Sequence, residues 1–136
     1  MKIPFVRLIA GLVITLASYA AMADFVVVVN PKNPATGITK DQIAQCFLGA
    51  TNAFSPIDLP ESSPIRTEFY KVVTEKEPSQ VRSIWAKLVF TGKARPAKQM
   101  QTSEDVKKQV ASDVNAIGYI EKSAVDASVK VVFPPN

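Results

Sequence analysis

Apolar residues follow two different patterns along the chain, and each pattern predicts a different kind of element. Phe25–Val29 is an unbroken run dominated by valine. A continuous β-branched run is typical of a strand that is covered on both faces, as in an α/β sheet. Shorter runs predict further strands at 57–59, 116–120 and 129–133. Gly118 lies within one of these runs, at a position suited to a β-bulge or to the close approach of another element.

Four other stretches repeat apolar residues at intervals of three and four, which is the spacing of one helix face. The pattern predicts helices over 40–48, with Thr39 as N-cap, and from Pro64, from Pro78 and from about residue 103. We expect the following positions to face the core: Ile65, Phe69, Val72 and Val73 in the second helix, Val81, Ile84, Trp85, Leu88 and Val89 in the third, and Val106, Val110 and Val114 in the fourth. Helices and strands alternate, so the sequence predicts an α/β fold in which helices flank one sheet.

The N-terminal segment 1–23 has the layout of a leader. Met1–Arg7 carries two positive charges, Leu8–Ala23 is uncharged and mostly apolar, and Ala21-Met22-Ala23 supplies small residues at a cleavage point. This order is typical of a secretory signal peptide. A membrane anchor is the alternative, but the apolar run from Leu8 to Ala23 is shorter than the roughly 20 residues that cross a bilayer. We therefore expect cleavage after Ala23, a periplasmic protein, and one folded domain over residues 24–136.

The part of the chain after Ala23 has an ordinary globular composition and little net charge. Without Lys2 and Arg7 it carries 14 basic and 12 acidic side chains, and a net charge of +2 gives little support for nucleic-acid binding. The chain has no histidine and one cysteine, Cys46, which excludes a histidine-based triad, a Cys–His dyad and an ordinary zinc site. The sequence thus favours a binding protein without a cofactor over an enzyme. Cys46 shares a predicted helix face with Ile43 and Phe47, which favours a buried thiol over a reactive one.

The segment 61–66 has the composition expected of an anion site. A predicted strand leads into a loop containing Ser62 and Ser63, and a helix follows. The first turn of a helix has free N–H groups and a partial positive charge, which together favour a phosphate or sulfate. The two hydroxyls would add donors, and Arg66 could supply a planar fork for a tetrahedral oxyanion. The alternative is that Ser63 is only a helix cap and Arg66 is only solvated.

Two further features have both a functional and a structural interpretation. Lys93, Arg95 and Lys98 form a basic loop after the third helix, which could steer anions or could be ordinary solvated surface. Trp85 could stack on a ligand, but its place in a regular apolar stripe favours core packing.

Four segments follow one another in an order that is known from a protein family. They are Ile38–Ile43 with Phe47-Leu48-Gly49, then Ser62–Arg66, then Val89–Gly92, and finally Ala116–Tyr119. The combination resembles the phosphate-type substrate-binding proteins of ABC transporters. The resemblance implies the type II periplasmic-binding-protein architecture, a mixed central sheet flanked by helices. Full-length members close two α/β lobes on the ligand, whereas the segment 24–136 provides room for about one lobe.

The resemblance also implies roles for individual residues. Ser63 takes the place of the family's loop serine, and Glu61 takes that of an acid able to accept a proton from hydrogen phosphate. The chain departs from the pattern at Pro64, where the family has a glycine, and at Ile65, where it has a threonine. Leu59 stands where the family has an arginine, four positions before the loop serine.

These observations lead to two hypotheses. In the first, the protein is an exported binding module for inorganic phosphate or a similar oxyanion, linked to ABC-type transport and to a membrane permease. Ser62, Ser63, the backbone at Ile65 and Arg66 would hold the anion, and Glu61 would respond to its protonation. In the second, the lobe has lost its ligand and serves as an interaction or accessory module that docks on an envelope protein. A homodimer would supply a second lobe in either case.

Overall fold

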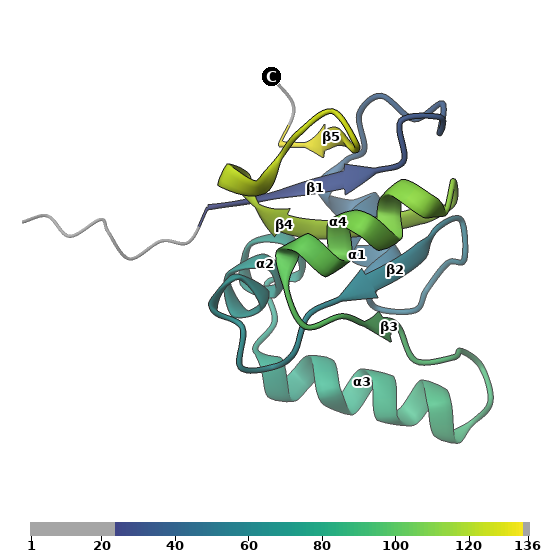
Figure 1. The fold of residues 1–136 in the computed structure, drawn as a ribbon. Helices are drawn as coiled ribbons and strands as arrows, with labels where there is room; N and C mark the ends of the chain where they lie inside the picture. Colours follow the sequence, from purple (N-terminus) through teal and green to yellow (C-terminus); the bar gives the residue numbers. More distant parts are fainter. Residues whose placement is uncertain (1–23, 135–136) are drawn as a thin grey trace, which may run out of the picture.

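A five-stranded mixed sheet crosses the protein in the order β3-β2-β4-β1-β5 (Figure 1). The structure is a computed structural model that describes residues 24–134, so the predicted signal peptide lies outside the described residues. The strands are β1 (Phe25–Val29), β2 (Ser55–Asp58), β3 (Lys98–Gln99), β4 (Ala116–Glu121) and β5 (Lys130–Phe133). The strands β3, β2 and β4 run parallel, whereas β1 pairs antiparallel with both β4 and β5. The predicted α/β class and mixed sheet are confirmed.

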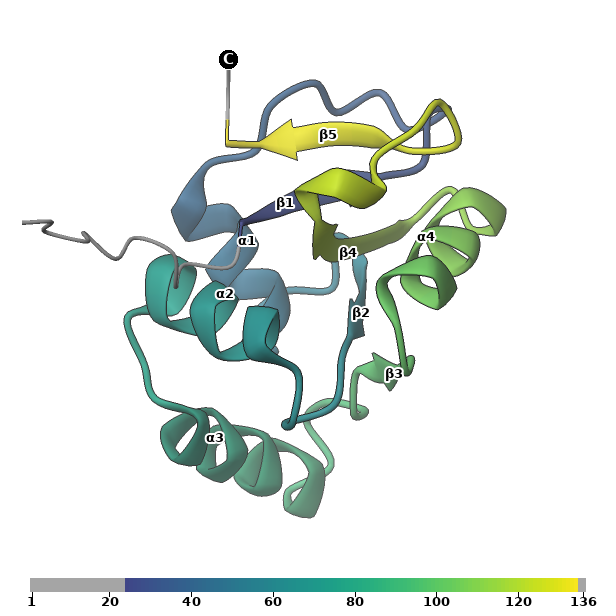
Figure 2. The same ribbon diagram turned by 60° about the vertical axis from the view of Figure 1, so that its left-hand side comes forward.

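Helices cover both faces of this sheet. The four helices are α1 (Lys40–Phe47), α2 (Pro64–Thr74), α3 (Pro78–Phe90) and α4 (Ser103–Ser112), and a short 3-10 turn, η2, covers Lys122–Ala124. Figure 2 shows α1 and α2 on one side of the sheet and α4 on the other, with α3 set apart beyond the β3 edge. The predicted caps are in place, because the Thr39 hydroxyl accepts from the Gln42 N–H at 3.1 Å and Pro64 is the first residue of α2.

The core lies where α1 and α2 meet the central strands. Phe47, Phe69, Tyr70 and Tyr119 form an aromatic cluster in which the rings of Phe69 and Tyr119 stack with centroids 4.0 Å apart. Such a pair adds about 0.5–1.5 kcal/mol to the area it buries. On the opposite face, α4 packs so tightly that a Cβ at Gly118 would lie 2.7 Å from Val106 Cγ1. The close-approach interpretation of this glycine is confirmed, and the pairing of β1 with β4 is regular through it.

Three valines that we expected in the core are exposed. Val72 is solvent-facing because the buried face of α2 is centred on Phe69 and Tyr70. Val114 is exposed because α4 already ends at Ser112. Val89 is exposed because α3 packs mainly on α2 and is set apart from the sheet (Figure 2).

The prediction that the apolar face of α3 lies in the core is therefore wrong for most of the helix. Only Val81 is fully buried, while Ile84, Trp85 and Leu88 are half-buried. The helix ends in Phe90, whose side chain is 91% exposed. The spacing was correctly that of an amphipathic helix, but it does not say how much of the apolar face finds a partner.

Candidate functional site

The carboxyl ends of the three parallel strands meet at one edge of the sheet, and a pocket lies in front of them. Its volume is about 420 Å³. Ligands of open α/β sheets typically bind at such an edge. We call it the strand-end pocket, and it is lined by Leu59, Pro60, Ser62, Ser63, Pro64, Ile65, Gln101, Thr102, Ser103 and Glu121. Segments that follow β2 and β3 thus share one pocket with the last residue of β4.

The first wall of this pocket is the N-terminus of α2. Ser63 is the N-cap, yet its side chain makes no capping hydrogen bond, so its hydroxyl is available to a ligand. Its own N–H donates to Pro60 O at 2.9 Å, and the Arg66 N–H donates to Ser63 O at 3.1 Å. Pro64 has no N–H. The Ile65 N–H is therefore the one amide of this first turn that a ligand could use, together with the Ser62 and Ser63 hydroxyls.

The second wall is the N-terminus of α4, which the sequence analysis did not assign to the site. The Thr102 hydroxyl accepts from the Asp105 N–H at 3.1 Å and caps the helix. The Ser103 hydroxyl accepts from the Glu121 N–H at 3.1 Å, which fixes the end of β4 against α4. Nothing in the sequence places Thr102 and Ser103 opposite Ser63, because that requires the strand order.

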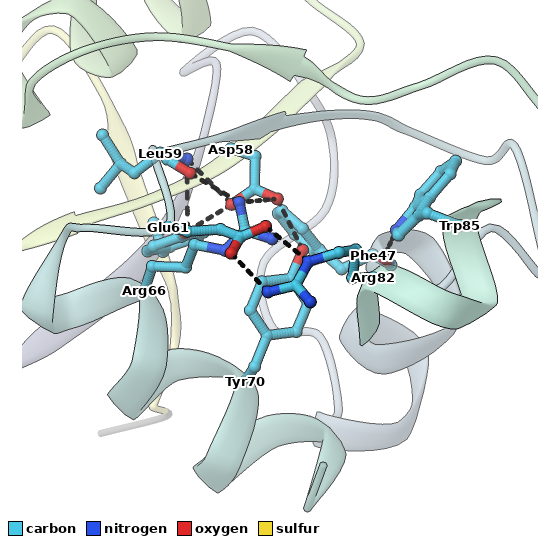
Figure 3. A network of polar contacts seen from close by, with 9 residues as sticks. Phe47, Asp58, Leu59, Glu61, Arg66, Tyr70, Arg82 and Trp85 are labelled. Atoms are coloured by element: carbon cyan, nitrogen blue, oxygen red, sulfur yellow. Dashed lines mark hydrogen bonds and ion pairs between the residues drawn. The ribbon is translucent and has the colours of Figure 1, made fainter. Parts of the chain in front are cut away.

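Arg66 does not reach the strand-end pocket. Its guanidinium is buried beneath the loop, where Nη1 donates to Leu59 O at 2.8 Å and lies 3.5 Å from Asp58 Oδ2 (Figure 3). The structure thus replaces the expected arginine fork on the ligand with an arginine that holds the loop from below. No lysine or arginine is among the described residues that line the pocket.

Asp58, the last residue of β2, is the centre of this buried polar network. Its carboxylate accepts hydrogen bonds from the hydroxyl of Tyr70 at 2.7 Å, from the hydroxyl of Tyr119, and from the Leu59 N–H at 2.8 Å. Burial, and then the charge of Asp58, raises the pKa of both Tyr70 and Tyr119, so the two phenols remain donors. The sequence signal for Asp58 was an acidic residue inside a predicted strand, a position that needs partners when buried.

Glu61 faces α3 and is not among the residues that line the pocket. Arg82 donates two hydrogen bonds to its carboxylate, from Nη2 to Oε1 at 2.8 Å and from Nε to Oε2 at 3.2 Å (Figure 3). The hydrogen bond from Arg82 lowers the pKa of Glu61. The acidic residue among those that line the pocket is instead Glu121, so the geometry does not support the role that the resemblance implied for Glu61.

A second and larger pocket lies at the amino end of β2. We call it the basal pocket; its volume is about 790 Å³. It is lined by Cys46, Gly49, Ala50, Thr51, Asn52, Phe54, Ser55, Pro56, Trp85, Gly92, Lys93, Ala94, Arg95, Pro96, Ala97 and Lys98. Cys46 is a buried free cysteine, as predicted, and burial raises the pKa of its thiol. The indole N–H of Trp85 donates to Phe47 O at 2.7 Å, which attaches α3 to the end of α1.

Two kinds of feature are absent from the described part of the chain. Residues 24–134 contain no group of three or more side chains suited to hold a metal ion. Within the same range, no helix combines the length and apolar character that crossing a membrane requires.

The fold is similar to that of phosphate-binding proteins of ABC transporters. No protein-family model and no curated protein sequence matches the chain. Among solved structures, an ABC-type phosphate transport receptor from Vibrio cholerae matches with a TM-score of 0.63 and 20% identity, over 81% of this chain and 45% of its own. A putative phosphate ABC transporter substrate-binding protein from Clostridium perfringens, solved with bound phosphate, matches with a TM-score of 0.64 and 21% identity, over 81% of this chain and 44% of its own. PstS from Borrelia burgdorferi matches with a TM-score of 0.61 and 13% identity, over 81% of this chain and 46% of its own.

These matches define the class of fold. The chain has the α/β architecture of a periplasmic binding protein, as the resemblance implied, and it spans somewhat less than half the length of the neighbours it matches. The neighbours are transport binding proteins and not enzymes.

Proposed function

We propose that the protein is an exported binding module whose strand-end pocket takes up phosphate or a similar tetrahedral oxyanion. One observation carries the proposal: two helix N-termini, both rich in hydroxyls, converge on a single pocket at the carboxyl ends of three parallel strands. Helix N-termini favour anions because unpaired N–H groups and the helix dipole act together. The fold similarity to phosphate-binding proteins supports the same choice of ligand.

Each residue of the pocket has a role in this proposal. The hydroxyls of Ser62 and Ser63 and the Ile65 N–H donate to the anion from α2, and the Ser103 hydroxyl donates from α4. The carboxylate of Glu121 accepts a hydrogen bond from the hydroxyl group of a protonated phosphate. Arg66 acts indirectly, because it fixes the carbonyl of Leu59 and thereby the loop that carries the serines.

The affinity of this pocket should be modest. A micromolar ligand requires about 8 kcal/mol of binding free energy. A hydrogen bond to a charged group supplies about 1.5–3 kcal/mol and a helix end about 0.3–1 kcal/mol, and part of this is lost to competing water. Because the described residues that line the pocket include no lysine or arginine and one acidic residue, Glu121, we expect millimolar binding. A second lobe, or a second copy of the chain, would exclude water and tighten it.

Calorimetry with residues 24–136 tests the proposal. We expect heat from phosphate at millimolar concentration and less heat from sulfate, which carries no proton for Glu121. Ser63→Ala should weaken phosphate binding about tenfold, the cost of one hydrogen bond to an anion. Ser79→Ala is the matched control, since Ser79 is an exposed serine in the first turn of α3, away from the pocket. Equal binding by Ser63→Ala and the unchanged protein would refute the role of this pocket.

The second candidate is an interaction module without a small ligand. The absence of any lysine or arginine from the described residues that line the strand-end pocket favours it. In that case a normally folded protein gives no heat with phosphate, and the partners to test are an ABC permease and other envelope proteins. Sizing chromatography tests the homodimer in parallel.

Export is part of the same proposal. Mass spectrometry of the mature protein should give a chain that begins at Asp24. A chain retaining Met1 in the membrane fraction would contradict both the cleavage and the periplasmic location.

A further inference from the structure

Positive charge is concentrated in one continuous part of the chain. The segment from Pro78 to Ser103 contains five basic side chains and no acidic one. The remainder of 24–136 has nine basic and twelve acidic side chains, a net charge of −3. Arg82 is paired with Glu61, so the four cations left in the segment are Lys87, Lys93, Arg95 and Lys98. Charge is therefore unevenly distributed over the domain. We call α3 with its following loop the positive end.

Three of these cations surround the basal pocket. Lys93, Arg95 and Lys98 line it, and none has a salt bridge to any residue that the structure describes. No aspartate or glutamate is among the described residues that line this pocket. Like charges that share a concave site focus the local potential and attract counter-ions. The described lining of the basal pocket therefore carries positive charge only, whereas that of the strand-end pocket carries the single negative charge of Glu121.

The size and shape of the basal pocket argue against a single small anion. At about 790 Å³ the basal pocket is nearly twice as large as the strand-end pocket and far larger than one phosphate requires. Three cations around a hollow of this size suit a ligand that carries several separated negative charges. The cations also surround a hollow, whereas a bilayer presents a flat surface.

The surroundings of the pocket suit a polypeptide. The edge strand β3 has no neighbouring strand on its outer side among the described residues, and its Lys98 lines the pocket together with Trp85 of α3, so backbone of the sheet edge borders the pocket. The aromatic side chains of Phe54 and Trp85 line the pocket and provide an apolar contact between the charges. A ligand that matches both features is extended, rich in carboxylates and has an apolar side chain among them.

We propose that the basal pocket binds an extended acidic segment of a partner polypeptide. Its carboxylates pair with Lys93, Arg95 and Lys98, and one apolar side chain packs beside Trp85.

The single tryptophan of the chain makes the proposal directly testable. Trp85 lines the basal pocket and not the strand-end pocket, so its fluorescence reports directly on ligand contact in the basal pocket. The probe is a short peptide in which glutamates flank one leucine, and the control peptide has glutamine in place of each glutamate. We expect a saturable change in Trp85 emission with the acidic peptide and none with the control.

Two matched triple variants complete the experiment. Lys93→Glu, Arg95→Glu and Lys98→Glu together should weaken peptide binding by at least about tenfold. Lys32→Glu, Lys71→Glu and Lys108→Glu make the same change in net charge at sites outside the pocket and should have much less effect. Circular dichroism confirms that both variants are folded. An equal loss in the two variants would show a general charge effect and overturn the proposal.

Vesicles and inorganic phosphate give the remaining outcomes. If the protein cosediments with anionic vesicles and the acidic peptide leaves Trp85 emission unchanged, the positive end is a membrane-binding surface and the proposal is wrong. If phosphate alone changes Trp85 emission and displaces the peptide, the basal pocket is a small-anion site and the proposal is also wrong. Phosphate binding at the strand-end pocket is measured by calorimetry and weakened by Ser63→Ala, whereas peptide binding at the basal pocket is weakened by the Lys93, Arg95 and Lys98 variant, so the two proposals fail separately.

Discussion

The two ends of β2 carry pockets built from different kinds of charge. At the carboxyl end, helix N-termini and hydroxyls supply partial charges, and the one formal charge in the described lining, Glu121, is negative. At the amino end, Lys93, Arg95 and Lys98 supply formal positive charges on long side chains. Partial charges act only within hydrogen-bond distance and therefore select by geometry, whereas formal charges act over a Debye length and select by net charge. The comparison predicts that the two ends respond differently to mutation and to salt.

The largest effect should come from the network that fixes the carboxyl end. Asp58→Ala removes the acceptor of Tyr70 and Tyr119 and leaves the buried guanidinium of Arg66 without a carboxylate. Breaking a buried ion pair in this way costs about 3–5 kcal/mol. Urea denaturation measures the loss of unfolding free energy. Asp41→Ala, at an exposed position in the first turn of α1, should cost less than about 1 kcal/mol.

A loss of under about 1 kcal/mol for Asp58→Ala would contradict this account. The double change Asp58→Ala with Arg66→Met should recover part of the stability, because it removes the unpaired charge as well as its partner.

The second effect concerns the packing of α3 beside the basal pocket, at the amino end of β2. Gly49 has φ +76°, and a Cβ there would lie 2.6 Å from Leu88 Cδ1 and 3.4 Å from Trp85. Gly49→Ala should cost about 1–2 kcal/mol through backbone strain and should shift Trp85 emission as α3 moves. Gly92→Ala is the control, since Gly92 has φ +73° and nothing within 4 Å of the same position. It should lose similar stability without the spectral shift; identical spectra for the two variants would mean that α3 is not held by this contact.

The third effect is the response to salt. Raising the ionic strength from about 0.05 to about 0.5 M should weaken binding of the acidic peptide about tenfold, because the exposed cations are screened. Phosphate binding should fall less, about twofold to threefold, since its donors are dipoles at contact distance. Titrations of both ligands at each ionic strength measure the slopes. Parallel slopes would remove the distinction between the two ends.

The smallest effect is expected from the ion pair between Glu61 in the strand-end loop and Arg82 in α3. Arg82 lowers the pKa of Glu61 in the folded protein, so the pair stabilises the fold above the unfolded pKa of about 4.3, and the contribution is lost as pH falls through the lower folded value. The unchanged protein should therefore be slightly more stable than Glu61→Gln at pH 7, and the difference should shrink as the pH falls below about 4.3. Glu68→Gln is the control for the loss of a carboxylate that has no ion pair among the described residues.

The sequence predicted local structure well and spatial relations poorly, for identifiable reasons. The start of α2 at Pro64 and the cap of α1 at Thr39 follow from interactions within a few residues. The direction of Arg66 does not, because it depends on Asp58 being left buried at the end of β2 with room for a guanidinium beside it. The serine loop was found at the pocket, while the α4 wall was missed, since only the order β3-β2-β4 brings Ser103 to Ser63.

The bidentate pair between Glu61 and Arg82 has one more consequence. Glu61 belongs to the loop that forms the strand-end pocket, and Arg82 belongs to the helix that carries Trp85 into the basal pocket. A ligand that moves either segment would change the geometry of this ion pair. Thermodynamic linkage then requires the effect to be reciprocal: each ligand changes the affinity of the protein for the other by the same factor.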